Sequence, residues 1–291
     1  MEHPAVAALF VVLLWWGSTG IIFYLDGLPR TTHRLSLLGA TGVGLAGLWG
    51  LVASAGDPSA GGAYLAVASA IAVWGWHELS FLMGLVTGPR RHACAPGCHG
   101  WRHFRHGVEA ILYHELAIAA TAGVIALLTW GGANPTGLWV FLALWAMRLS
   151  AKLNLHFGVP NTAAELLPEH MSYLGSFFSR GRVNLFFPVS VTLGTIAVIW
   201  LLAVAIAAPA GSASGIGNLM LATLVALAVF EHWLLILEIP ASGLWRWALG
   251  PRARPEFEPE IEADEARLPS MPSKTTHAEL RAQVVTFPRG G

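Results

Sequence analysis

Imidazole and carboxylate side chains stand side by side within long apolar stretches of this 291-residue chain, at His77-Glu78, His114-Glu115 and Glu231-His232. Such groups are costly in hydrocarbon, so each of them needs a partner there. Glutamates and histidines on several helices of one bundle are also the ligands that di-metal centres use. Candidate metal ligands are therefore His77, Glu78, His114, Glu115, His156, Glu231, His232 and Glu238.

Cationic side chains accompany these groups. Arg148, Lys152 and His156 recur every four residues and would share one face of a helix. Such a stripe could pair with the glutamates or hold an anionic group of a substrate. The candidate polar network and anion contacts are Arg148, Lys152, Asn154 and His170.

A charge count leaves the chemistry of this region open. Five carboxylates in the apolar stretches (Glu78, Glu109, Glu115, Glu231 and Glu238) face two cations, Arg148 and Lys152. The surplus must be protonated, paired with imidazolium or neutralised by a metal. Three interpretations follow: a structural network of ion pairs, a metal site, or a pathway for protons or a ligand. Glu109 points away from His114 on a helical projection and is expected at the interface instead.

The segment 88–107 carries a second group of residues that could bind a metal. Cys94-x₃-Cys98 with His99, His103 and His106 could supply thiolate and imidazole ligands to zinc. Paired cysteines of zinc sites usually have two residues between them, however, and here there are three. The interpretation we favour is a basic surface loop that lies on anionic headgroups. Its membrane-surface contacts would be Arg90, Arg91, Trp101, Arg102 and Arg105.

Composition fixes the class of protein that must position these residues. Apolar residues make up 55% and charged residues 12% of the chain, whereas about a quarter of a soluble domain is charged. The sequence therefore predicts an all-α, polytopic membrane protein. A net charge of zero gives no attraction to nucleic acid. Stretches long enough to cross a bilayer as helices occupy 5–25, 35–55, 63–87, 108–130, 138–156, 185–207 and 219–241.

Arginines set the expected orientation. They follow the first, third, fifth and seventh stretches, whereas the connections 56–62, 131–137 and 208–218 contain no Lys or Arg. The positive-inside rule then predicts an N-outside, C-inside protein with a membrane domain at 1–249. Residues 250–291, rich in acidic residues and proline, are expected to form a disordered cytoplasmic tail. The connection 157–184 is expected to lie at the interface and cap the bundle.

Several runs of the sequence resemble one known family. These are WWGSTGIIFYLDGLPR (15–30), WGWHELSFLMGLVTGPRR (74–91), YHELAI (113–118), SAKLNLHFGVPNTAAELLPEHMSYLGSFF (150–178), NLFFPVSVTLGT (184–195) and EHWLLILEIP (231–240). They look like photosynthetic complex assembly protein 2, the PuhE-type membrane proteins of purple photosynthetic bacteria. The resemblance implies a multi-pass inner-membrane protein that acts in assembly of the reaction centre and light-harvesting complex or in the supply of bacteriochlorophyll. The resemblance does not imply any particular catalytic residues.

Two main hypotheses follow. The first is a non-enzymatic assembly factor whose partners are reaction-centre or light-harvesting subunits, pigment-biosynthesis enzymes and lipids. Deep tryptophans such as Trp74 and Trp145 could form walls for bacteriochlorophyll or a carotenoid. The second is a His/Glu metalloenzyme that acts on a lipid-soluble or tetrapyrrole substrate, with the metal as Lewis acid or redox centre. Proton or cation transport is a third hypothesis, which clustering of the polar residues toward one side disfavours.

Overall fold

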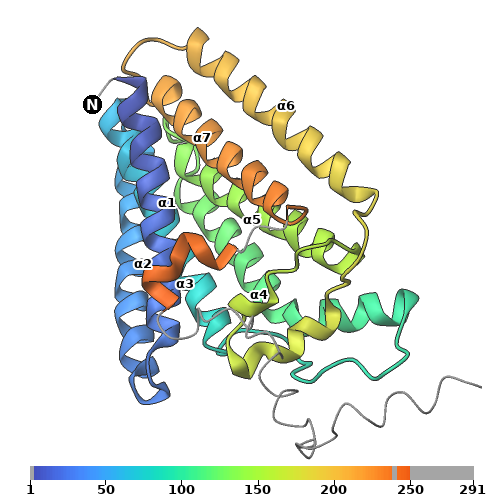
Figure 1. The fold of residues 1–291 in the computed structure, drawn as a ribbon. Coiled ribbons are helices and arrows are strands. Elements are labelled where there is room, and N and C mark those ends of the chain that lie inside the picture. Colours follow the sequence, from blue (N-terminus) through green and yellow to red (C-terminus); the bar gives the residue numbers. More distant parts are fainter. Residues whose placement is uncertain (1–2, 238–240, 250–291) are drawn as a thin grey trace, which may run out of the picture. The chain divides into compact units, whose positions relative to one another are not determined.

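The computed structural model describes residues 3–237 and 241–249, and within them no strand forms (Figure 1). Seven of its helices are long and apolar enough to cross a membrane, so the expected all-α, polytopic fold is confirmed. They are α1 (Pro4–Gly27), α2 (His33–Ala55), α3 (Ala60–Leu82), α4 (Gly100–Leu128), α5 (Thr136–Phe157), α6 (Phe186–Ala207) and α7 (Ala213–Leu234). The expected tail at 250–291 lies outside the described residues.

Helix α3 lies at the centre of the bundle. It contacts α1, α2, α4, α5 and α7, whereas α6 packs mainly along α7. Of its most apolar 18 residues, 67% are buried, against at most 44% in any other of the seven helices. The part of α3 that contains His77 and Glu78 is therefore enclosed by protein rather than by lipid.

Three helices have a boundary that differs from the predicted one by five residues or more. Helix α3 ends at Leu82 instead of residue 87, because Gly84 adopts a left-handed conformation with φ +74°. The backbone N–H groups of Gly84 and Leu85 bond back to the carbonyls of Phe81 and Ser80, which is the Schellman pattern that stops a helix. Helix α4 begins at residue 100 instead of 108, and α7 spans 213–234 instead of 219–241.

The connection between α5 and α6, residues 158–185, is the covering segment. It contains two 3₁₀ helices, η2 (Ala164–Leu166) and η3 (Glu169–Phe177). Its His170 Nε2 lies 2.8 Å from the carbonyl oxygen of Leu82 at the end of α3. The Asn161 amide donates to the Leu234 carbonyl at the end of α7 (2.9 Å). The covering segment thus satisfies carbonyls that helix ends leave without intrahelical partners.

Asn184 joins two helices within this segment. Its side-chain amide donates to the Gly158 carbonyl (2.7 Å) just after α5, and its Oδ1 accepts from the N–H groups of Phe186 (2.8 Å) and Phe187 (3.0 Å) at the start of α6. We expect Asn184→Ala to lower the free energy of unfolding by about 1–2 kcal/mol, the usual cost of losing a helix cap. Equilibrium unfolding in detergent micelles measures this.

The matched control is Asn218→Ala. Its amide donates only to the Ser214 carbonyl one turn earlier in α7, so its removal is expected to change the stability by less than about 0.5 kcal/mol. Equal losses in the two variants would show that Asn184 does not link α5 to α6.

Candidate functional site

Two ion pairs join α3, α4 and α5, and the one between Lys152 and Glu115 is largely buried. Lys152 Nζ lies 2.6 Å from Glu115 Oε1, and Arg148 Nη2 lies 3.3 Å from Glu78 Oε2. The indole N–H of Trp145 donates to the other oxygen of Glu115 (2.8 Å). The cationic stripe of α5 therefore reaches carboxylates on two different helices, which is how charges inside a membrane are usually accommodated.

The intramembrane histidines have separate partners. His77 Nε2 lies 3.0 Å from Thr121 Oγ1, and His232 Nε2 lies 2.9 Å from Ser150 Oγ. His114 is fully buried, with its ring tilted against Phe81 (centroids 4.5 Å apart) and its Nε2 3.8 Å from Glu78 Oε1. The rings of His77 and His114 also face each other (centroids 6.4 Å apart), but these imidazoles and that of His232 are not gathered around a common centre.

The eight candidate metal ligands are not brought together as one set. Of the remaining members, His156 lies against His103 near the start of α4 (ring centroids 5.0 Å apart), and Glu238 lies outside the described residues. Among the residues that the structure describes, a group close enough to share one ion is formed instead by Cys94, Cys98 and His106. The geometry of the polar cluster fits the interpretation as a network of ion pairs better than that as a metal site.

The ion pairs also change the charge count. Glu109 lies 3.3 Å from Arg105 Nε and 3.9 Å from Arg90 Nη1, so this carboxylate is balanced by cations outside the apolar stretches. Glu78 and Glu115 are balanced by Arg148 and Lys152. Glu231 forms no ion pair within 4 Å in the described part of the chain. The expected surplus of three negative charges is therefore too large.

Glu231 lines a cavity of ≈ 280 Å³ between α1, α3, α5 and α7. The cavity wall is mostly apolar, and residues 161–163 of the covering segment contribute to it. The Arg148–Glu78 pair and Glu231 bring charge to an otherwise hydrophobic and aromatic surface, a combination typical of ligand sites. Its aromatic lining residues include Trp15, Phe23, Trp74 and Trp245.

The remaining members of the predicted polar network are structural. Asn154 is fully buried and donates to Ser190 Oγ on α6 (3.0 Å). His170 contacts the end of α3, as described above. Neither residue lines the cavity, so an anion contact at these two positions has no support in the geometry.

The backbone that follows α3 lies directly on α4, a feature that sequence reasoning missed. The Thr87 carbonyl accepts a hydrogen bond from the backbone N–H of His114 (2.8 Å). A Cβ atom at Gly88 would overlap the Glu109 carbonyl oxygen and would lie 2.7 Å from that of Ala110. Only a glycine allows this close approach of the two backbones. The approach sets the position of His114 along α3. The signal in the sequence is Gly88-Pro89, which we interpreted only as a turn.

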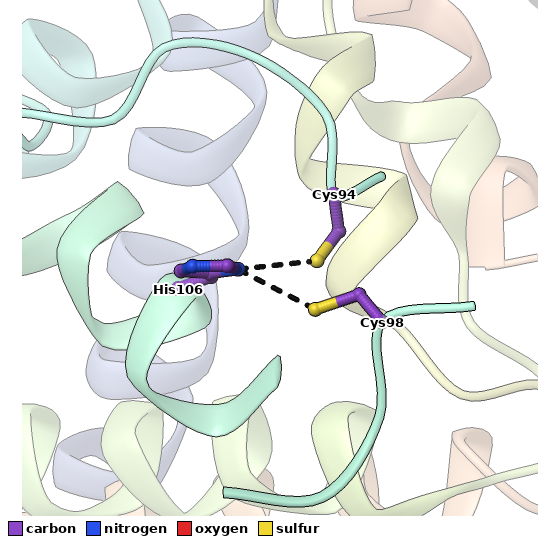
Figure 2. A group of neighbouring side chains, drawn as sticks. All are labelled: Cys94, Cys98 and His106. Carbon is purple, nitrogen blue, oxygen red and sulfur yellow. Dashed lines mark hydrogen bonds between the residues drawn. The ribbon is translucent and has the colours of Figure 1, made fainter. Parts of the chain in front are cut away.

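Cys94, Cys98 and His106 meet at the start of α4 (Figure 2). The two Sγ atoms come from the loop and point at the same edge of the imidazole, and each lies 3.4 Å from His106 Nδ1. His103 Nδ1 lies 3.5 Å from Cys94 Sγ. Burial, reinforced by the neighbouring Cys98, raises the pKa of the Cys94 thiol, so a nearby cation would be needed to hold it as thiolate at neutral pH.

The basic residues around this cluster do not all face outward. Arg91, Trp101, Arg102 and Arg105 are exposed, with the indole of Trp101 stacked on Phe104 (centroids 5.2 Å apart). Arg90, in contrast, has only 15% of its side chain exposed, because it turns toward Glu109. The surface-loop prediction also placed all these residues in a loop, whereas 101, 102 and 105 lie on the first turns of α4.

Comparisons with known proteins cover the membrane region. A family model described as "Protein of unknown function (DUF3623)" matches residues 1–256. An uncharacterised 30.4 kDa protein in the puhA 5′ region of Rhodobacter capsulatus is 38% identical over 274 residues, which are 92% of this chain and 99% of that protein. No solved structure matches the chain. The match to the family model includes all seven long helices.

Proposed function

We propose that this chain, which belongs to the DUF3623 family, is a non-enzymatic, PuhE-type assembly factor of the photosynthetic reaction centre and light-harvesting complex. The position of the relative in the puhA 5′ region supports this role, because that region belongs to a photosynthesis gene cluster. The host membrane would be the bacterial inner membrane, with the start of the chain outside and the arginine-bearing loops inside.

The cavity beside Glu231 is the observation that carries the proposal. It offers a carboxylate and a guanidinium in a largely apolar wall, where a partner could bury a hydrophobic group and anchor a polar one. Its volume of ≈ 280 Å³ is slightly below the range of about 300–1,000 Å³ that is usual for small-molecule sites. It therefore suits a side chain of a partner helix or the tail of a pigment better than a whole tetrapyrrole.

The contacts of the polar cluster give less support to the alternative, a His/Glu metalloenzyme. Both Glu115 oxygens and one Glu78 oxygen already bind cations or an indole. A metal at this site would have to displace ion pairs that neutralise Arg148 and Lys152, and uncompensated cations in a membrane are costly. The cluster is better suited to holding α3, α4 and α5 together.

Co-purification tests the proposed function. We expect the tagged full-length chain, extracted from photosynthetically grown cells in mild detergent, to recover photosynthetic subunits or pigment above an untagged strain. Ala143 lines the cavity, so Ala143→Phe should fill it and reduce the recovery about tenfold, a loss of about 1.4 kcal/mol in binding. Mass spectrometry and the absorption spectrum provide the readout.

The matched control is Ala203→Phe, on an exposed face of α6 away from the cavity. This variant should recover partners at the wild-type level. The proposal is wrong if the wild-type chain enriches neither photosynthetic subunits nor pigment. Equal losses of recovered partner in the two phenylalanine variants would instead show that the partner does not bind at the cavity.

A further inference from the structure

We propose that Cys94, Cys98, His103 and His106 bind a zinc ion that fixes the loop after α3 to the first turns of α4. The site is separate from the polar cluster and the cavity, and it does not depend on the proposed function. Two thiols and two imidazoles form a ligand set that zinc binds in structural sites.

The distances agree with a tetrahedral zinc centre. Zinc–sulfur bonds of about 2.3 Å and zinc–nitrogen bonds of about 2.0–2.1 Å place sulfur and nitrogen ligands about 3.6 Å apart around a tetrahedron. The structure has 3.4 Å from His106 Nδ1 to each sulfur and 3.5 Å from His103 Nδ1 to Cys94 Sγ. The ligand atoms of Cys94, Cys98 and His106 all lie within 4.8 Å of one another. These three residues form the core of the site, and His103, whose Nδ1 is already near Cys94 Sγ, would supply the fourth ligand.

Hydrogen bonding alone explains this arrangement poorly. A ring nitrogen has either one lone pair or one proton, so His106 Nδ1 can make a linear hydrogen bond with only one sulfur. Yet both sulfurs approach the same nitrogen at the same distance of 3.4 Å. A cation between the three atoms would satisfy all of them at once.

The local fold delivers the ligands without strain. Cys94 precedes and Cys98 ends the turn at Ala95–Cys98, which is closed by a hydrogen bond from the Cys98 N–H to the Ala95 carbonyl (3.1 Å). His103 and His106 are three residues apart on α4 and therefore share one face. Such a loop–helix arrangement of two cysteines and two histidines resembles the order of ligands in small zinc modules.

The site would also join the loop to the covering segment. The Cys94 N–H donates to Ser176 Oγ (2.9 Å), and the His103 ring contacts those of His156 (centroids 5.0 Å apart) and Phe177 (5.9 Å). Helix α4 has 29 residues, so at about 1.5 Å per residue it exceeds the roughly 30 Å hydrocarbon core by about nine residues. Because its polar turns are the first ones, the cluster would lie outside the hydrocarbon, within reach of ions.

Metal analysis of the purified full-length chain tests the proposal. The chain would carry a tag without histidine and be extracted in mild detergent, without chelator, from cells supplied with zinc. We expect about one zinc per chain, and less than about 0.2 in Cys94→Ser/Cys98→Ser and in His106→Ala. His99→Ala should keep its zinc, because His99 is exposed and its Nδ1 bonds to the Gly97 carbonyl instead.

Cobalt gives a second readout that does not depend on zinc content. Cells grown with cobalt should yield a protein with a thiolate-to-cobalt charge-transfer band, absent from the cysteine variant and retained in His99→Ala. The same elution volume in size-exclusion chromatography shows that the variants are folded. A wild-type chain with less than about 0.2 thiophilic metal per chain, a Cys94–Cys98 disulfide in its mass spectrum, or a cysteine variant that keeps its zinc would each overturn the proposal.

Discussion

Glu115→Gln is expected to lower the free energy of unfolding by about 3–5 kcal/mol, because it leaves a buried cation without its counter-charge. Lys152 Nζ lies 2.6 Å from Glu115, and only 16% of the lysine side chain and 17% of the glutamate side chain are exposed. The loss should appear as a lower midpoint in equilibrium unfolding and as a smaller yield of monodisperse protein in detergent.

Two further variants separate charge from shape. Glu115→Gln combined with Lys152→Met removes both charges at similar volume and should recover most of the loss, since an isosteric apolar replacement of a buried pair is often neutral. Arg105→Gln removes an ion pair whose arginine is 62% exposed, and it should cost at most about 1 kcal/mol. If the double variant is as unstable as Glu115→Gln, the buried charge is not the cause.

Gly88→Ala is the second substitution with a large expected effect. Its new Cβ would overlap the backbone of α4 at Glu109 and Ala110, and backbone cannot rotate away as a side chain can. The loop must then leave α4 and release the bond from His114 to Thr87. We expect a loss of stability at the upper end of about 1–3 kcal/mol, with faster hydrogen exchange at the amide of His114.

Gly181→Ala is the matched control for this loop glycine. Position 181 is also outside the long helices, but a Cβ there would meet nothing within 4 Å. We expect its stability to stay within about 0.5 kcal/mol of the wild type. Unchanged exchange at His114 in Gly88→Ala would contradict the close approach of the loop to α4.

The membrane-spanning helices could be predicted from the sequence because apolar length alone identifies them. The boundaries that were wrong are those where polar residues continue or break a helix. The first turns of α4 carry Arg102, His103 and Arg105 and have no apolar run to reveal them. The early end of α3 depends on the left-handed Gly84, which in sequence is one glycine among the 32 in the chain.

The candidate site was predictable in part. Spacing by four placed Arg148 and Lys152 on one face of α5, and both do reach carboxylates. The sequence could not say which carboxylate each would bind, because this depends on the rotation of α3 and α4 about their axes. The sequence also favoured a membrane-surface loop over a metal site of cysteines and histidines for residues 88–107. The two histidines come to the cysteines only because α4 begins at residue 100.

The covering segment has an electrostatic consequence. Helices α3, α5 and α7 all end beneath it, and each C-terminus carries a partial charge of about −0.5 from aligned peptide dipoles. Arg180 of the covering segment, which pairs with Val159 just after α5, and Arg90 of the loop before α4 stand on the side where these negative ends gather. The same positive charges that would orient the chain in its membrane thus also complement its helix ends. An inverted variant, made by moving those arginines to the opposite loops, would therefore lose their favourable interaction with the helix C-termini and should be less stable than the wild type.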